Sequence, residues 1–157
     1  MPKIFLIDPE RCNGCRLCEI VCSVVKEGAS DPSRSRIHVC DWEMEEMYFP
    51  LVCLHCEEPL CASVCPVIGI QRDEEILNRV VADKERCVCC RACVSICPHG
   101  GLIFDSKDRK ILRCDLCGGD PACVKVCEPN AIQYVESDAA VMNKKRTGAK
   151  RIGELIL

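Results

Sequence analysis

The feature that most constrains this chain is its cysteines: 18 occur in 157 residues, and sixteen of them form four groups of four. The groups are Cys12, Cys15, Cys18 and Cys22; Cys53, Cys56, Cys61 and Cys65; Cys87, Cys90, Cys93 and Cys97; and Cys114, Cys117, Cys123 and Cys127. Because only six residues are aromatic (one Trp, two Tyr and three Phe), conventional core material is scarce. Small folds of this kind are usually held together by disulfides or metal.

The cysteine groups belong to an internal repeat. Residues 8–22 (DPERCNGCRLCEIVC) align without gaps on 83–97 (DKERCVCCRACVSIC), with identity at eight of fifteen positions. Residues 53–65 (CLHCEEPLCASVC) match 114–127 (CDLCGGDPACVKVC) after the insertion of one residue. Two motif types therefore alternate along the chain, and a duplicated half-chain is the economical explanation.

The spacing of the cysteines is typical of 4Fe-4S clusters. The pattern Cys-x2-Cys-x2-Cys-x3-Cys lets one loop supply three thiolates to a cluster, while the fourth cysteine reaches a neighbouring cluster. Tetrahedral zinc uses two Cys-x2-Cys pairs and has no use for a third and fourth cysteine at this spacing. Disulfides would have to close very short loops. We therefore predict four 4Fe-4S clusters with all sixteen cysteines as ligands.

Short apolar runs predict strands, and the cysteine spacing predicts helices. The third and fourth cysteines of each group are four residues apart, which places them on one face of a helix beginning at the third cysteine. Pro66 and Pro98 are expected to end two of these helices. The predicted strands cover residues 4–7, 37–39, 80–82, 102–104 and 131–134. The predicted fold class is α+β: a duplicated bacterial 2[4Fe-4S] ferredoxin-like fold, with short strands and helices wrapped around four clusters.

Two features suggest how the groups share clusters. Only the second and third groups end in Cys-Pro, and the gap between Cys65 and Cys87 resembles the short linker of a two-cluster ferredoxin. As a hypothesis, these groups form one ferredoxin-like unit at 51–104, inserted into an outer unit at 1–50 and 105–140. The predicted cluster sets are Cys12, Cys15, Cys18 and Cys127; Cys114, Cys117, Cys123 and Cys22; Cys53, Cys56, Cys61 and Cys97; and Cys87, Cys90, Cys93 and Cys65.

Three further residues resemble ligands but are not assigned to clusters. Cys89 aligns with Gly14 of the first copy, so it is interpreted as a spare loop residue. Cys40 lies in a strand-like run and is expected to be a small buried thiol. His55 lies between two ligands, but every cluster already has four cysteines, so a satisfied or exposed histidine is expected.

The charge of the chain changes once clusters are counted. The formal net charge is −3, and each oxidised cluster with its four thiolates adds about 2 negative charges. Basic neighbours of the motifs are expected to raise cluster potentials, unless they are ordinary surface charges. These neighbours are Arg11, Arg16, Arg86, Arg91, Arg113 and Lys125. Residues 141–157 are expected to form a basic C-terminal arm that contacts a partner, and the acidic total disfavours nucleic acid.

The remaining sequence argues against secretion, membrane insertion and catalysis. There is no apolar stretch of signal-peptide or membrane-span length, so we expect a soluble cytoplasmic protein, although a partner's signal could export it. No GxGxxG, phosphate-binding loop or HExxH motif occurs, and four complete cysteine quartets leave no open iron. The chain is therefore expected to have no catalytic site of its own.

The segments CLHCEEPLCASVCP and CDLCGGDPACVKVC are similar to the second and fourth motifs of a known family. This is the dimethyl sulfoxide reductase iron–sulfur subunit family, the four-cluster subunits of molybdenum or tungsten bis-pterin oxidoreductases and related hydrogenase complexes. The resemblance covers residues 4 to about 134 and implies the nested pairing above, a near-linear file of clusters and docking on a large catalytic subunit. In its brevity the chain resembles short cytosolic members that serve tungsten aldehyde oxidoreductases, formate dehydrogenases or hydrogenases.

The predicted function is therefore an electron relay. Single electrons would pass between the cofactor of a catalytic subunit and an acceptor or donor such as a flavin subunit or ferredoxin. The alternative is an iron–sulfur sensor or a structural scaffold. Redox titration separates the two, because a relay needs reversible centres that feed a partner.

Overall fold

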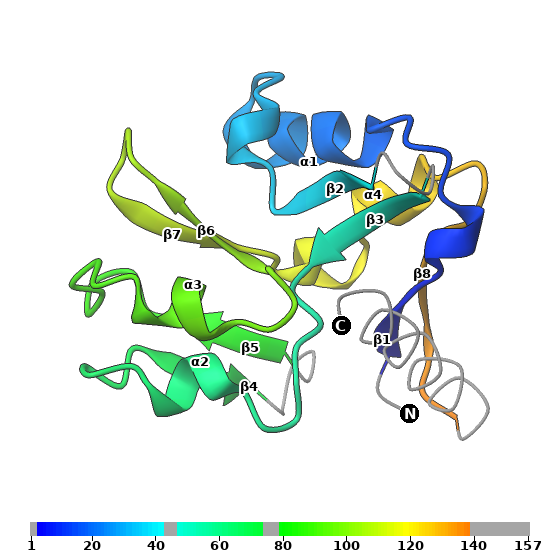
Figure 1. The fold of residues 1–157 in the computed structure, drawn as a ribbon. Helices are drawn as coiled ribbons and strands as arrows, with labels where there is room; N and C mark the ends of the chain where they lie inside the picture. The colour runs from blue at the N-terminus through cyan, green and yellow to red at the C-terminus, as the bar shows by residue number, and fades with distance from the viewer. Residues whose placement is uncertain (1–2, 43–46, 74–78, 139–157) are drawn as a thin grey trace.

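The computed structural model describes residues 3–42, 47–73 and 79–138 (Figure 1). In this part of the chain, eight strands form four two-stranded antiparallel sheets with short helices between them. The strands are β1 (Lys3–Ile7), β2 (Ile37–Trp42), β3 (Met47–Val52), β4 (Ile70–Asp73), β5 (Arg79–Ala82), β6 (Leu102–Asp105), β7 (Lys110–Arg113) and β8 (Ile132–Glu136). The helices are α1 (Leu17–Glu27), α2 (Leu60–Ser63), α3 (Ala92–Ile96) and α4 (Ala122–Lys125), with 3-10 turns η1 (Pro9–Arg11), η2 (Pro32–Arg34) and η3 (Leu116–Gly119). None of these described helices is long and apolar enough to span a bilayer.

The first and last strands pair with each other. β1 and β8 are antiparallel, with Phe5 opposite Tyr134 and Ile7 opposite Ile132, and they lie side by side in Figure 1. The rings of Phe5 and Tyr134 are 5.6 Å apart between centroids, and Phe5 and Ile132 are buried. Because the first cysteine group follows β1 and the fourth precedes β8, this pairing brings the two groups together.

The other three sheets are hairpins: β2 with β3, β4 with β5, and β6 with β7. β2 buries Ile37 and Val39 on alternate positions, as the period of two in a strand requires. β3 and β7 each end immediately before the first cysteine of a group, at Cys53 and Cys114. The hairpins therefore determine where these two cysteine loops begin.

The buried side chains form two cores. The first contains Phe5, Ile37, Val39, Val52, Leu116 and Ile132 with Cys18, Cys22, Cys53, Cys114 and Cys123. The second contains Ile70, Val80 and Leu102 with Cys61 and Cys93. The second core lies within the predicted inserted unit, whereas the first combines residues of both units, because Val52 and Cys53 fall within 51–104. The division into an outer and an inserted unit stays a prediction. Since cysteines supply much of each core, the stability of the interior depends on what the sulfurs bind.

The backbone repeats along with the sequence. Gly14 and its counterpart Cys89 have φ angles of 70° and 57°, and Arg16 and its counterpart Arg91 have φ angles of 58° and 63°. Arg16 directly precedes α1, which contains Cys18 and Cys22. Arg91 directly precedes α3, which contains Cys93 and ends just before Cys97. These matched left-handed conformations are what a duplicated half-chain predicts, and the duplication itself remains a prediction.

The predicted helices are present, but three of them are shorter than expected. Each helix begins one residue before the third cysteine of its group, and only α1 continues through the fourth. The prediction that the third and fourth cysteines share a helix face is therefore confirmed for Cys18 and Cys22 and wrong for the other groups. In the second and third groups the physical reason is proline: Cys65 and Cys97 precede Pro66 and Pro98, and a residue before proline avoids the helical region.

The five predicted strands are all found, with ends shifted by one to three residues. The strands that were not predicted are β3, β4 and β7. β3 contains Pro50, and β4 (IQRD) and β7 (KILR) are four residues long with charged ends, so their apolar patterns are weak. The predicted basic arm at 141–157 lies outside the described residues.

Candidate metal centres

One hollow is lined by four cysteines that come from opposite ends of the described chain. We name these four cysteines set I. Cys12, Cys15 and Cys18 come from the loop after η1 and the start of α1, and Cys127 follows α4. The hollow has an empty volume of ≈ 300 Å³, which includes space open to solvent. The pairing of β1 with β8 accounts for this meeting, and the four residues are those that the sequence predicts for one cluster.

A second hollow adjoins the same helix and defines set II. It is lined by Cys22 from α1, by Cys114 and Cys117 from the segment after β7, and by Cys123 from α4. Its empty volume is ≈ 330 Å³, again including open space. Because Cys18 and Cys22 are one helical turn apart on α1, that helix serves both hollows.

A third hollow, set IV, lies in the half of the molecule that contains α2 and α3. Cys87, Cys90 and Cys93 meet Cys65 there, around an empty volume of ≈ 430 Å³. Cys89 also lines this hollow, although its thiol donates a hydrogen bond to the backbone oxygen of Arg109 at 2.7 Å. Three of the four predicted quartets thus each surround a common space.

The remaining quartet, set III, consists of Cys53, Cys56, Cys61 and Cys97. Burial raises the pKa of Cys53 to about 11, and the nearby Cys61 and Cys56 add to the rise. Burial also raises the pKa of Cys61, with further contributions from Cys97 and Cys56. Each of these sulfurs therefore interacts electrostatically with another member of the set.

The buried thiols fit a positively charged iron centre. Burial raises the pKa of Cys18 and of Cys123 to about 12, and burial raises that of Cys114 as well. Such thiols stay protonated at neutral pH unless a cation replaces the proton, and the thiolate is the form that binds metal. Within the described residues no three Cys, His, Asp or Glu side chains converge as ligands of a single ion. The sulfurs surround larger spaces, as the corners of a polynuclear cluster do.

The four sets follow one another in a series. Cys18 of set I and Cys123 of set II interact electrostatically. Cys114 of set II interacts with Cys53 of set III, and Cys93 of set IV interacts with Cys61 of set III. These electrostatic interactions link the predicted sets in the order I, II, III, IV.

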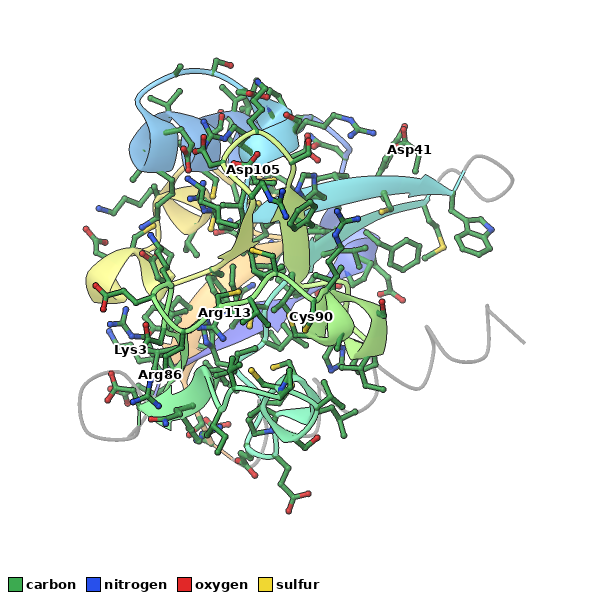
Figure 2. The ribbon with its side chains drawn as sticks, turned by 90° about the vertical axis from the view of Figure 1, so that its left-hand side faces the viewer. Lys3, Asp41, Arg86, Cys90, Asp105 and Arg113 are labelled. Atoms are coloured by element: carbon green, nitrogen blue, oxygen red, sulfur yellow. The ribbon has the colours of Figure 1, made fainter. Side chains whose placement is uncertain are left out.

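The two ends of the series differ from its middle in exposure. Cys15 of set I and Cys90 of set IV are exposed, whereas every cysteine of sets II and III is buried or half-buried. Figure 2 shows Cys90 beside the short helix α3. The exposed cysteines of the four sets therefore lie in the two terminal sets.

Backbone N–H groups hold several sulfurs. Gly69 donates to Cys65 Sγ at 3.3 Å, and Gly101 donates to Cys97 Sγ at 3.4 Å. Hydrogen bonds to ligand sulfur favour the more negative, reduced form of a cluster. Neither donor was predicted, although both segments share the pattern Cys-Pro-x-x-Gly (CPVIG and CPHGG), which could have revealed them.

Two predictions about unassigned residues are resolved by the structure. Cys40 is exposed, so the expectation of a buried thiol is wrong: β2 buries Ile37 and Val39, and Cys40 faces the other side. The expectation of a satisfied or exposed histidine holds only for one ring nitrogen: His55 Nδ1 accepts the Val80 N–H at 3.1 Å, whereas Nε2 is shielded from solvent and has no hydrogen-bond partner among the described residues. Burial, reinforced by neighbouring arginines, lowers its pKa to about 4, so the ring is neutral at neutral pH.

Most of the basic residues near the motifs are bound by other protein groups. Arg16 pairs with Asp41 at 2.8 Å, Arg86 pairs with Asp83 at 3.3 Å, and Lys125 pairs with Asp120. The guanidinium of Arg91 lies 3.8 Å from the centroid of the Phe104 ring. Arg113 differs from these four, because the described residues provide no hydrogen-bond partner for its Nε and Nη1 atoms.

The fold and the four cysteine sets define an iron–sulfur protein. Residues 44–137 match the family described as 4Fe-4S dicluster domain, and residues 4–29 match a 4Fe-4S binding domain. The first match covers more than half of the 157 residues. The chain therefore belongs to the 4Fe-4S dicluster domain family.

Named relatives agree with this assignment. The chain is 38% identical over 122 residues to the aliphatic sulfonate oxidoreductase, polyferredoxin-like subunit, of Pyrococcus furiosus, covering 78% of this chain and 69% of that protein. It is 31% identical over 148 residues to a polypeptide of the anaerobic dimethyl sulfoxide reductase of Escherichia coli, covering 83% of this chain and 71% of that protein. The resemblance found in the sequence, to iron–sulfur subunits of the dimethyl sulfoxide reductase type, is confirmed.

A solved structure shares the fold. One protein of the active site complex BamBC of benzoyl coenzyme A reductase, in complex with benzoyl-CoA, matches with a TM-score of 0.51 and 27% sequence identity. The match covers 96% of this chain and 89% of that protein. The ferredoxin-like 4Fe-4S arrangement of short helices and antiparallel strands is thus shared with a subunit of an oxidoreductase.

Proposed function

We propose that this chain carries single electrons through four 4Fe-4S clusters, as the non-catalytic subunit of an oxidoreductase complex. Its partners would be a large catalytic subunit of the molybdenum or tungsten pterin type and a flavin subunit or ferredoxin. The observation that carries the proposal is the series of cysteine sets, three of which line separate hollows. The relatives named as oxidoreductase subunits favour this relay over the sensor or scaffold alternative.

The protein's own residues provide what such a relay needs. When bound, 4Fe-4S clusters supply centres that take up and release one electron each. Five of the eight cysteines of sets II and III are buried and so shielded from water: Cys22, Cys53, Cys61, Cys114 and Cys123. Low exposure and fixed backbone donors reduce the rearrangement that accompanies each change of charge.

The order of the sets suggests where partners attach. Electrons would enter at set I or set IV, where Cys15 and Cys90 are exposed, and leave at the opposite end. Sets II and III would pass them across the middle of the molecule. The predicted cytoplasmic location and the absence of nucleic-acid and membrane binding remain predictions about the complex.

The first test is the composition of the protein prepared without oxygen. The proposal expects about 16 iron and 16 sulfide per chain, from four clusters of four irons, and reversible reduction of every centre. Electron paramagnetic resonance (EPR) during a redox titration would show the centres as they fill. Bound zinc, clearly less iron, or centres that do not reduce reversibly would refute the relay.

The second test identifies the partner. Affinity purification of the tagged chain from anaerobically grown cells of its own source should yield a larger oxidoreductase subunit that contains a metal–pterin cofactor. Recovery of the cluster-loaded chain with no other oxidoreductase subunit would contradict the proposed complex. It would leave the cluster assignment itself to be judged by iron content.

A further inference from the structure

Arg113 is a half-buried cation that forms no ion pair with a carboxylate of the described residues. It is the last residue of β7 and directly precedes Cys114. Its Nε and Nη1 atoms are shielded from solvent and have no hydrogen-bond partner among the described residues. A buried guanidinium normally pairs with an anion, because burial of an uncompensated charge is costly. The side chain therefore requires an acceptor.

Sulfurs are prominent among the charged neighbours of Arg113. Burial lowers its pKa most, and the charges of Cys53, Cys61, Cys114 and Cys93, in that order, act against this. Cys53 and Cys61 belong to set III, Cys114 to set II and Cys93 to set IV. Arg113 therefore lies where three cysteine sets approach one another, and it interacts most strongly with set III. Figure 2 shows it in the middle of the molecule, whereas Arg86 lies toward the edge in the same view.

A comparison of the two copies of the second motif type shows that only one copy has an arginine at this position. When the two groups of the second motif type are aligned on Cys53 and Cys114, Arg113 corresponds to Val52. Val52 is buried in the first core. The shared backbone thus accepts an apolar residue at this position, and an arginine is not needed to form the loop.

We propose that Arg113 donates its free Nε–H and Nη1–H groups to sulfur acceptors at the junction of sets II and III, and that its charge raises the reduction potential of the set III cluster. This inference rests on the cluster assignment in the proposed function. In each transfer across the junction, one set loses one electron and the other gains it. Arg113 stabilises the added negative charge on set III, so it favours arrival of the electron there.

The test is a redox titration of the anaerobically loaded protein, monitored by EPR, in three versions. Arg113→Gln removes the charge, Arg113→Lys keeps the charge but loses the planar set of donors, and Arg86→Gln is the matched control. Arg86 also directly precedes the first cysteine of a group, but its side chain is 61% exposed and paired with Asp83. Cys56→Ser identifies which EPR signal belongs to set III.

In Arg113→Gln, the set III cluster should be reduced only at a lower potential. At a fixed potential its ratio of reduced to oxidised cluster should be about tenfold smaller, which corresponds to a shift of about 59 mV for one electron. Arg113→Lys should shift the same signal by less, and Arg86→Gln should leave it unchanged. The shift should persist in high salt, because a buried charge is poorly screened.

An unchanged set III potential in Arg113→Gln with full iron content would overturn the inference, as would an equal shift in Arg86→Gln. Should Arg113→Gln fail to hold its iron, Arg113→Lys decides: a downward shift of the set III signal supports the inference, and no shift overturns it. Failure of the proposed function is seen separately, as missing clusters in the unmodified protein before any titration of variants.

Discussion

The two copies of the first motif type hold their sulfurs alike but differ in the helix that carries their last cysteines. α1 has eleven residues and α3 has five. Both begin after an arginine in the left-handed region, Arg16 and Arg91. The fourth cysteine of the first copy precedes Ser23, which continues the helix, whereas that of the second precedes Pro98. The repeat therefore preserves the loop that presents the sulfurs and varies the segment that packs beyond it.

The two copies of the second motif type differ inside the core. Val52 and Leu116 are buried apolar residues, and they align with Arg113 and His55 respectively in the other copy. His55 and Leu116 share a left-handed backbone, with φ angles of 50° and 61°. Each copy therefore places one polar and one apolar residue at these two positions, in opposite order. Burial lowers the pKa of His55 most, and the charge of Arg113 is the next cause. Because the polar and apolar residues are exchanged between the copies, the region where the copies meet is asymmetric.

The largest effect is expected from a change that tests how the copies share clusters. Cys65→Ser should remove the cluster of set IV, about 4 of about 16 irons, although Cys65 belongs to the second group and the other set IV ligands to the third. The EPR signal lost should match that lost in Cys90→Ser. If it instead matches the signal lost in Cys56→Ser, each group supplies its own cluster and the crossed pairing is wrong.

A second effect compares the glycines that donate to the two Cys-Pro sulfurs. A Cβ on Gly101 would lie 2.5 Å from Cys53 Cα and 2.6 Å from Cys53 N, whereas the nearest atom to a Cβ on Gly69 would be 3.5 Å away. Gly101→Ala must displace the backbone that carries a set III ligand, so we expect a destabilisation of about 3 kcal/mol. Gly69→Ala should change stability little.

Denaturant unfolding of the loaded protein, with iron release followed in parallel, measures both glycine variants. Equal stability losses in the two variants would mean that the close approach of Gly101 to Cys53 does not distinguish the copies. The set III signal should weaken in Gly101→Ala before the set IV signal does, since the displaced atoms belong to Cys53.

A smaller effect concerns the hairpin that carries Arg113. Arg34 in η2 pairs with Asp105 at 2.9 Å and also with Asp108. Asp105 is buried and accepts the Lys107 N–H at 2.9 Å, whereas Asp108 is half exposed. Asp105→Asn should therefore cost about 2 kcal/mol of unfolding free energy, and Asp108→Asn much less. Equal losses of unfolding free energy in the two variants would show that the burial of Asp105 does not strengthen its ion pair with Arg34.

The cysteine pattern was enough to predict the family and the quartets that line three of the hollows, and short apolar runs predicted the strands at 4–7 and 131–134. It could not show Arg113 as different from Arg86, because both simply precede a cysteine in the sequence. Only burial and the absence of a described partner separate them. The misjudged Cys40 shows the same limit: a strand-like run indicates a strand, but which face lies inside depends on the sheet that forms.

The spacing of the cysteines alone could not predict the helix lengths either. Cys18 and Cys22 have the same separation as Cys61 and Cys65, yet only the first pair lies within one helix. Spacing permits a helix face, and in the second and third groups the proline after the fourth cysteine prevents the helix from continuing. Pro66 carries that information, because a proline restricts the backbone of the cysteine before it as well as ending the helix.

The smallest expected effect is a pH dependence at the end of the longer helix. Burial alone would raise the pKa of Glu27, but the hydrogen bond from Arg36 and the charges of Arg36, Lys110 and Arg34 lower it below its ordinary value. Lys110 belongs to β7, so this carboxylate links α1 to the strand that carries Arg113. The folded chain therefore binds fewer protons at Glu27 than the unfolded chain does between the lowered and the ordinary pKa.

The stabilisation from Glu27 is fully present above the ordinary pKa of the carboxyl and is lost as the pH falls through the lowered one. Glu27→Gln should reduce stability at neutral pH and should reduce the steepness with which stability falls in acid. Unfolding of the loaded protein by denaturant at a series of pH values measures this, with Glu58→Gln, at an exposed position, as the control. A Glu27→Gln curve parallel to the unmodified one would place the acid sensitivity elsewhere, and the link between α1 and β7 would then be maintained by packing rather than by charge.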